Sequence, residues 1–139
     1  MSTEWGRASR TATLPTSVHA PGLARDLLAE ICERARLADG TTQTALLLTS
    51  EVVTNAVTHC EGDPVLTVEV EPDRMRVSVG DRSLARPQVV PAPARLSEHG
   101  RGMWLVDRLA SRWGVDILDA RQKVVWFELD RAAATPHPA

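Results

Sequence analysis

The sequence contains no tyrosine, one phenylalanine and, among its 16 basic residues, one lysine. It also lacks long hydrophobic runs: the longest span a few residues, as at 45–48, whereas a membrane helix needs about 20. A net charge of −2 gives no broad basic surface for phosphates, which argues against general nucleic-acid binding. The first ten residues have no apolar signal core. We therefore expect a cytoplasmic protein that neither spans a membrane nor binds nucleic acid directly.

The length and composition are those of one globular domain. A chain of 139 residues fits one hydrophobic core, and a hydrophobic fraction of 43% is enough to build it. Cys32 and Cys60 have no metal-ligand spacing, so we expect two buried thiols rather than a disulfide or zinc site. We expect the domain over 11–131, a flexible N-terminus over 1–10 and a disordered tail over 132–139.

Hydrophobic periodicity predicts a strand and two helices in the first half of the chain. The strand is expected over 10–14, the first helix from a cap at Thr16 or Ser17 to about residue 39, and the second from Thr41 or Thr42 to about Cys60. The first helix has apolar positions at helical spacing, namely Leu23, Leu27, Leu28, Ile31 and Ala35. These positions are expected to face the core.

The second half reads as two hairpins around a loop and a helix. Apolar and polar residues alternate over 66–79 with a turn at 71–74, and a second hairpin is expected with Val115 and Ile117 on one arm and 124–129 on the other. Residues 82–99 contain three prolines and little periodicity, and a loop of that length in a compact domain is usually functional, so we expect a lid. A helix is expected over 102–111. This order predicts an α+β two-layer sandwich, with helices on one face of a mixed, mostly antiparallel sheet.

Glu51 and Asn55 are four residues apart in the second helix and therefore lie on one face, which His59 continues. A helical wheel places them at the edge of an arc of apolar residues: Ala45, Leu46, Leu48, Val52, Val53 and Ala56. An amide oxygen suits a hard cation such as Mg²⁺, and a carboxylate can deprotonate a nucleophile. The same spacing also fits a solvated polar pair.

Asp81 closes the first hairpin on the side of Met75, Val77 and Val79. An ionised group on a core face needs a partner, because burying an unpaired charge is costly. The partner could be an amino group of a bound base or the residue's own backbone at a strand end.

Two glycines surround Arg101 directly before an amphipathic helix. Gly100 and Gly102 would leave backbone amides open at a helix start, which favours anion binding. The same glycines also fit a flexible loop end. No Gly-Lys-Ser/Thr follows, so this is not a Walker A loop.

Taken together, these segments resemble the motifs of GHKL ATPases. TSEVVTNAVTH at 49–59 is similar to the N box, VGDRS at 79–83 to the first glycine box and HGRGMWLV at 99–106 to the second. The resemblance covers about residues 12–130 and is greatest to the small bacterial anti-sigma factor serine/threonine kinases. It implies the Bergerat-type ATP-binding fold.

The resemblance also implies roles for individual residues. Glu51 would be the general base, Asn55 would bind magnesium and nucleotide, and Asp81 would bind the adenine amino group. Four further nucleotide-binding residues are implied: Ser83, Gly100, Arg101 and Gly102. The implied cofactors are ATP and Mg²⁺, the implied partners are a sigma factor and an anti-anti-sigma protein that is phosphorylated, and a homodimer is expected.

Three departures from the family pattern keep an alternative open. Ser83 stands where the first glycine box usually has glycine, Glu98 stands where some anti-sigma kinases have arginine, and no Gly-Thr pair marks the last hairpin. They favour a non-catalytic, ATP-responsive protein-binding module. The catalytic module of a two-component histidine kinase is less favoured, because no helix with a phospho-accepting histidine precedes the domain.

Overall fold

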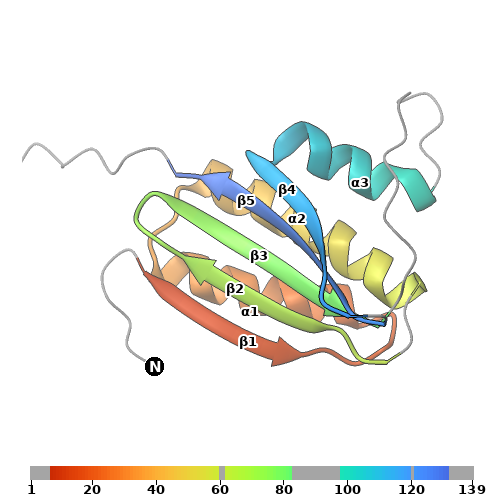
Figure 1. Ribbon diagram of the computed structural model, residues 1–139. Helices are drawn as coiled ribbons and strands as arrows, with labels where there is room; N and C mark the ends of the chain where they lie inside the picture. The colour runs from red at the N-terminus through yellow and green to blue at the C-terminus, as the bar shows by residue number, and fades with distance from the viewer. Residues whose placement is uncertain (1–6, 60–61, 83–97, 120, 132–139) are drawn as a thin grey trace, which may run out of the picture.

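The computed structural model describes residues 7–59, 62–82, 98–119 and 121–131, and it forms two layers (Figure 1). The elements are β1 (Ala8–Thr13), α1 (Ala20–Arg34), α2 (Asp39–His59), β2 (Val65–Val70), β3 (Arg74–Asp81), α3 (Glu98–Leu109), β4 (Arg112–Ile117) and β5 (Lys123–Asp130). The five strands form one sheet in the order β1-β2-β3-β5-β4, and all four ladders are antiparallel. Figure 1 shows α1 and α2 behind the sheet and α3 beside β4. The predicted α+β sandwich is confirmed.

Both predicted hairpins are present, and they meet in the middle of the sheet. In the first, Val68 pairs with Val77, and the turn closes with a 2.7 Å hydrogen bond from the amide of Glu71 to the carbonyl of Arg74. In the second, β5 pairs with β4 on one side and with β3 on the other. Phe127 of β5 is fully buried against the helices' side of the sheet. The chain thus places the end of β3 directly beside the start of β5.

The first helix begins later and ends earlier than predicted. Its N-cap is His19, with no side-chain cap, and Pro21 lies in the first turn. Thr16 instead bonds to Asp63, whose Oδ1 accepts from the Thr16 amide at 2.9 Å and from its hydroxyl at 2.6 Å. The helix ends at Arg34, and Arg36 adopts a left-handed conformation with φ of 55° that turns the chain toward α2. The predicted cap at Thr16 or Ser17 was therefore wrong.

The buried face of α1 is also shifted from the predicted one. Leu23 is 46% exposed, whereas Ala24 is fully buried beside Leu28 and Ile31. A small side chain lets α1 approach the neighbouring α2 closely, and α1 packs on α2 more extensively than on any strand. Burial here follows the docking of the helix and not the size of its apolar side chains.

The apolar arc predicted for the second helix is confirmed. Ala45, Leu48, Val52, Val53 and Ala56 are buried, and Leu46 packs against the core from its edge. The helix begins at Asp39, before the predicted Thr41 or Thr42. One polar residue, Thr49, is fully buried in the same arc.

Several segment boundaries differ from the predictions or lie outside the described residues. The first strand begins at Ala8, so it includes part of the expected flexible N-terminus. The third helix begins at Glu98, so the last two residues of the expected lid are helical. The remainder of that lid at 83–97, Cys60, residues 1–6 and the tail at 132–139 lie outside the described residues. Cys32 is buried in α1, where desolvation raises the pKa of its thiol to about 11.

Candidate ATP site

Glu51 and Asn55 lie half-buried at the edge of the apolar arc of α2, as their spacing predicted. They line a pocket of about 570 Å³ along the polar face of α2. Its other walls are Pro21 and Arg25 of α1 and six residues of α2: Leu46, Leu47, Ser50, Thr54, Thr58 and His59. This size is within the usual range for small-ligand sites. Both functional candidates are thus at a concave surface.

Gly102 brings α3 against the two polar residues of α2. A Cβ placed on Gly102 would lie 3.0 Å from Oε2 of Glu51, 3.2 Å from its Cβ and 3.6 Å from Nδ2 of Asn55. The first of these distances is too short for an ordinary contact, so the absence of a side chain at residue 102 is what allows the helix to sit there. The structure therefore joins the N box and the second glycine motif, although Asn55 and Gly102 are 47 residues apart in the sequence.

Three further residues expected to bind the nucleotide are only partly described. Gly100 and Arg101 fall within the first turn of α3, which begins at Glu98. Ser83 lies outside the described residues. The backbone amides at the beginning of α3 have no partner inside their own helix and carry the positive end of its dipole. An anionic group would be stabilised there.

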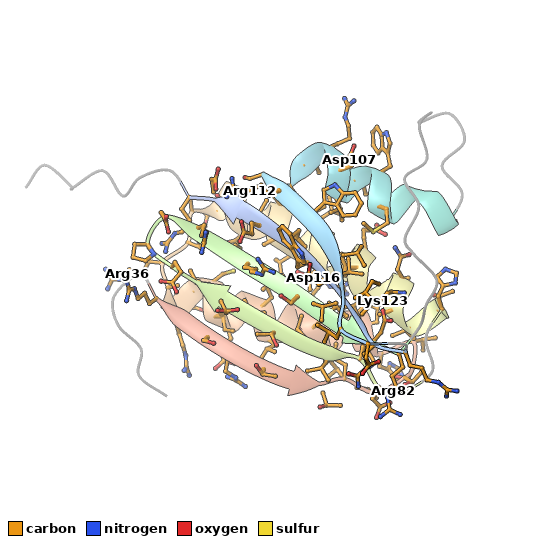
Figure 2. The ribbon with its side chains drawn as sticks, in the orientation of Figure 1. Arg36, Arg82, Asp107, Arg112, Asp116 and Lys123 are labelled. Atoms are coloured by element: carbon orange, nitrogen blue, oxygen red, sulfur yellow. The ribbon has the colours of Figure 1, made fainter. Side chains whose placement is uncertain are left out.

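Asp81 ends β3 on the face covered by the helices, and it has a charged partner. The Nζ of Lys123 lies 3.4 Å from Oδ1 of Asp81, and their side chains are 4% and 3% exposed. The two residues are cross-strand neighbours in the β3–β5 ladder. Figure 2 shows Lys123 at the edge of the sheet where β3, β4 and β5 converge, at the opposite end from Arg36. The predicted need for a partner is confirmed.

Asp81 does not line the pocket that contains Glu51 and Asn55. The structure therefore brings together three of the predicted residues, Glu51, Asn55 and Gly102, and holds Asp81 at the end of the neighbouring strand. Because α2 packs against β3 and β5, Asp81 lies on the same side of the sheet as these three residues.

Comparison with known proteins assigns the fold. The family model of the histidine kinase-like ATPase domain matches residues 13–129, which is most of the chain. The chain belongs to this family. No curated protein sequence matches it. The resemblance deduced from the three motifs is confirmed at this level.

A solved structure shares the fold of this histidine kinase-like ATPase domain. The crystal structure of the RsbU and RsbW domains of Rv1364c from Mycobacterium tuberculosis matches with a TM-score of 0.68 and 19% sequence identity. The match covers 91% of the present chain and 34% of the other. The chain thus spans about a third of the length of that protein, and the comparison establishes the fold alone.

Two charged features of this ATPase domain were not predicted from its sequence. The first is Lys123, which occupies a core-facing position of β5. The second is a cluster on the open face of the sheet, where Glu128 accepts hydrogen bonds from Arg112 at 2.8 Å and from Arg76 at 3.3 Å. Arg76 also stacks over the ring of Trp126 at 4.2 Å from its centroid. The two-residue period of a strand could have indicated the position of Lys123, because it places this residue on the apolar face of β5.

The donor set fits a nucleotide-dependent magnesium site better than a protein-only metal site. Within the described ranges, no three His, Cys, Asp or Glu side chains gather around a possible metal position. Mg²⁺ usually takes one or two protein oxygens and completes its shell with water and substrate phosphates. Asn55 and Glu51, which both line the pocket, have the oxygen-bearing side chains that such a partial shell would need. In the part of the chain that the structure covers, no helix has the length and apolarity needed to cross a bilayer.

Proposed function

We propose that the chain is an ATP-binding protein serine/threonine kinase of the anti-sigma factor type. It phosphorylates an anti-anti-sigma protein, binds a sigma factor and acts in the cytoplasm, with a homodimer as the expected assembly. The observation that carries the proposal is the contact of Gly102 with Glu51 and Asn55. It joins a carboxylate, an amide and the start of a helix in a chain of the histidine kinase-like ATPase family.

The chemistry assigned to this arrangement is transfer of the γ-phosphoryl group. The carboxylate of Glu51 accepts the proton of a substrate serine or threonine hydroxyl, whose oxygen then bonds to the γ-phosphorus. The bond from that phosphorus to the β–γ bridging oxygen breaks, and ADP leaves with the electron pair. Such proton transfer contributes about 10² to 10⁴ in rate.

The remaining residues bind the nucleotide. Asn55 contributes its amide oxygen to Mg²⁺, which when bound neutralises charge on the phosphates. The open amides in the first turn of α3, which includes Gly100 and Arg101, hold the phosphate oxygens, and Gly102 admits the phosphates because it has no side chain. The guanidinium of Arg101 provides a further donor. Asp81 accepts a hydrogen bond from the adenine amino group, and Ser83 borders the same part of the site.

The assignment of partners rests on the motif resemblance to anti-sigma kinases. It is supported by the fold shared with a structure that includes a domain named RsbW. Because the chain spans about a third of that protein, the activity of the larger protein is not transferred to it. The target is instead defined by its chemistry, as a folded protein that presents one serine or threonine hydroxyl to Glu51.

A non-catalytic ATP-responsive module is the second candidate. The observation that favours it is the position of Glu98, which is the first residue of α3. Some kinases of the resembling type have an arginine here, and an acidic residue at a phosphate-binding helix start repels the terminal phosphate. In this case ATP would order the site and change the partner surface without transfer.

Glu51→Ala separates the two functions. We expect the parent protein to transfer label from γ-labelled ATP to a serine or threonine of an anti-anti-sigma protein. The variant should bind ATP nearly as tightly and transfer at least about a hundredfold more slowly. Equal rates for both proteins would show that another residue is the base. ATP-dependent partner binding with no transfer by the parent would establish the non-catalytic module.

A further inference from the structure

Lys123 is the only lysine of the chain, and it occupies a position that the fold reserves for apolar side chains. The residues of β5 that face the helices alternate along the strand: Lys123, Val125, Phe127 and Leu129. All four are buried. On β3 the corresponding face ends in Asp81, directly opposite Lys123. The charged pair therefore closes an otherwise apolar layer at one end of the sheet.

Stability alone does not account for this pair. Both side chains lose nearly all their hydration, and a buried ion pair is often no more stabilising than apolar residues of similar volume. Lys123 instead lies opposite Asp81, the residue to which the proposed function assigns the contact with the adenine ring. An ammonium has three donors and a carboxylate has about four acceptor sites, so the two groups can pair and still contact a ligand together.

We propose that Lys123 is a specificity-determining residue of the nucleotide site, which donates a hydrogen bond to the ring nitrogen next to the amino group that Asp81 reads. This inference rests on the proposed binding of an adenine nucleotide. The 3.4 Å between Nζ and Oδ1 allows both side chains to reach adjacent atoms on one edge of a purine. The pair then recognises a donor and an acceptor side by side.

Adenine has this pattern, and guanine has the reverse. The adenine edge presents an amino donor at position 6 and an unprotonated acceptor at N1. In the same orientation, guanine presents a carbonyl oxygen at position 6 to the Asp81 carboxylate and an N–H at N1 to the Lys123 ammonium, so neither contact can form a hydrogen bond. With Lys123 present, guanine makes two mismatched contacts, whereas Asp81 alone would give one. Each mismatch leaves a buried charged group without a hydrogen bond. Lys123 thereby strengthens the selection that Asp81 would exert alone.

An ATP analogue tests the contact in the unmodified protein. In 1-deaza-ATP a C–H replaces N1 while the amino group remains, so only the acceptor for Lys123 is lost. We expect the parent protein to bind ATP about tenfold or more tightly than 1-deaza-ATP, as measured by calorimetry with magnesium. Equal affinities would overturn the inference and leave the proposed ATP binding intact. This comparison decides the matter even where a variant does not fold.

Lys123→Met removes the ammonium and keeps an apolar side chain of similar length. The variant should bind ATP and 1-deaza-ATP within about twofold of each other, and its preference for ATP over GTP should fall about tenfold. Arg76→Met is the matched control, because it removes another β3–β5 ion pair, to Glu128, on the opposite face of the sheet. It should retain the parent's preference for ATP over the analogue.

The outcomes distinguish this inference from the function on which it rests. A purely structural role of Lys123 would lower the stability of Lys123→Met and leave the ratio of the ATP and 1-deaza-ATP affinities unchanged. That result would overturn the inference alone. A parent protein that binds no adenine nucleotide would overturn the inference and the proposed function together.

Discussion

Gly102 and Glu51 are in such close contact that a single added methyl group at residue 102 would meet the carboxylate of Glu51 at 3.0 Å. The contact fixes the start of α3 against the middle of α2. It makes the glycine a packing requirement in addition to any role in admitting phosphates. The two roles can be separated by experiment.

Gly102→Ala should lower the stability of the domain by about 1–3 kcal/mol, because overpacking forces α3 or Glu51 to move. ATP affinity should fall with it. Urea unfolding and calorimetry measure the two effects. Gly40→Ala is the matched control, since a Cβ at Gly40 meets no atom within 4 Å, and it should be neutral or slightly stabilising. Adding Glu51→Ala to Gly102→Ala should recover part of the lost stability, and strict additivity of the two changes would contradict the contact.

Asn55→Ala should abolish magnesium-dependent ATP binding and leave the fold intact. Asn55 lies at the edge of the buried arc, so its loss opens no cavity in the core. Calorimetric titration with ATP, in magnesium and then in EDTA, measures the effect. Thr58→Ala, which alters another residue of the same pocket, should keep the magnesium dependence. An unchanged affinity of Asn55→Ala in magnesium would reject Asn55 as the metal ligand.

Thr49→Val should stabilise the domain by about 1 kcal/mol. Thr49 is fully buried, and none of the described residues gives its Oγ1 a hydrogen bond. Valine has nearly the same shape and the same branching at Cβ, so the change removes only the unsatisfied hydroxyl. Thr44→Val on the same helix is the control, because its hydroxyl donates to the carbonyl of Gly40 at 3.1 Å and its loss should be neutral or destabilising. Chemical denaturation distinguishes the two, and a destabilised Thr49→Val would mean that the hydroxyl has a partner.

Glu128→Gln should destabilise the domain by about 1–2 kcal/mol near neutral pH. The hydrogen bond from Arg112, joined by Arg76, holds the pKa of the Glu128 carboxyl below its ordinary value of 4.5, against the effect of burial. With a folded pKa below the unfolded one, this contribution is complete above about pH 4.5 and is lost as the pH falls through the folded pKa. The parent and Glu128→Gln should therefore converge in acid.

Urea unfolding from pH 7 to pH 3 tests the convergence. Asp116→Asn is the control, since Asp116 is exposed and lies 3.9 Å from Arg76, an arrangement that contributes little to stability. A constant difference between the parent and Glu128→Gln across this range would show that the ionised carboxylate is not what the arginines stabilise.

Local periodicity in the sequence determined the elements and the orientation of three key residues. The alternation over 66–79 placed Asp81 on the core side, and the 3.6-residue period of α2 placed Glu51 and Asn55 at the edge of its buried arc. Both inferences depend only on the backbone geometry of one strand or one helix. The motif order then indicated the ATPase family, which the match over 13–129 confirmed. The roles of the individual residues remain predictions.

Only the tertiary structure decided which of these residues meet and which helix faces are covered. Leu23 is exposed and Ala24 is buried, although leucine is the more apolar residue, because the docking of α1 on the rest of the domain decides which face is covered. The contact of Gly102 with Glu51 depends on how α3 docks, and the pairing of Lys123 with Asp81 depends on β5 inserting beside β3. The last two are contacts between residues more than 40 positions apart, whose alignment is set by packing and strand register over the whole sheet. A period within one segment carries no information about that alignment.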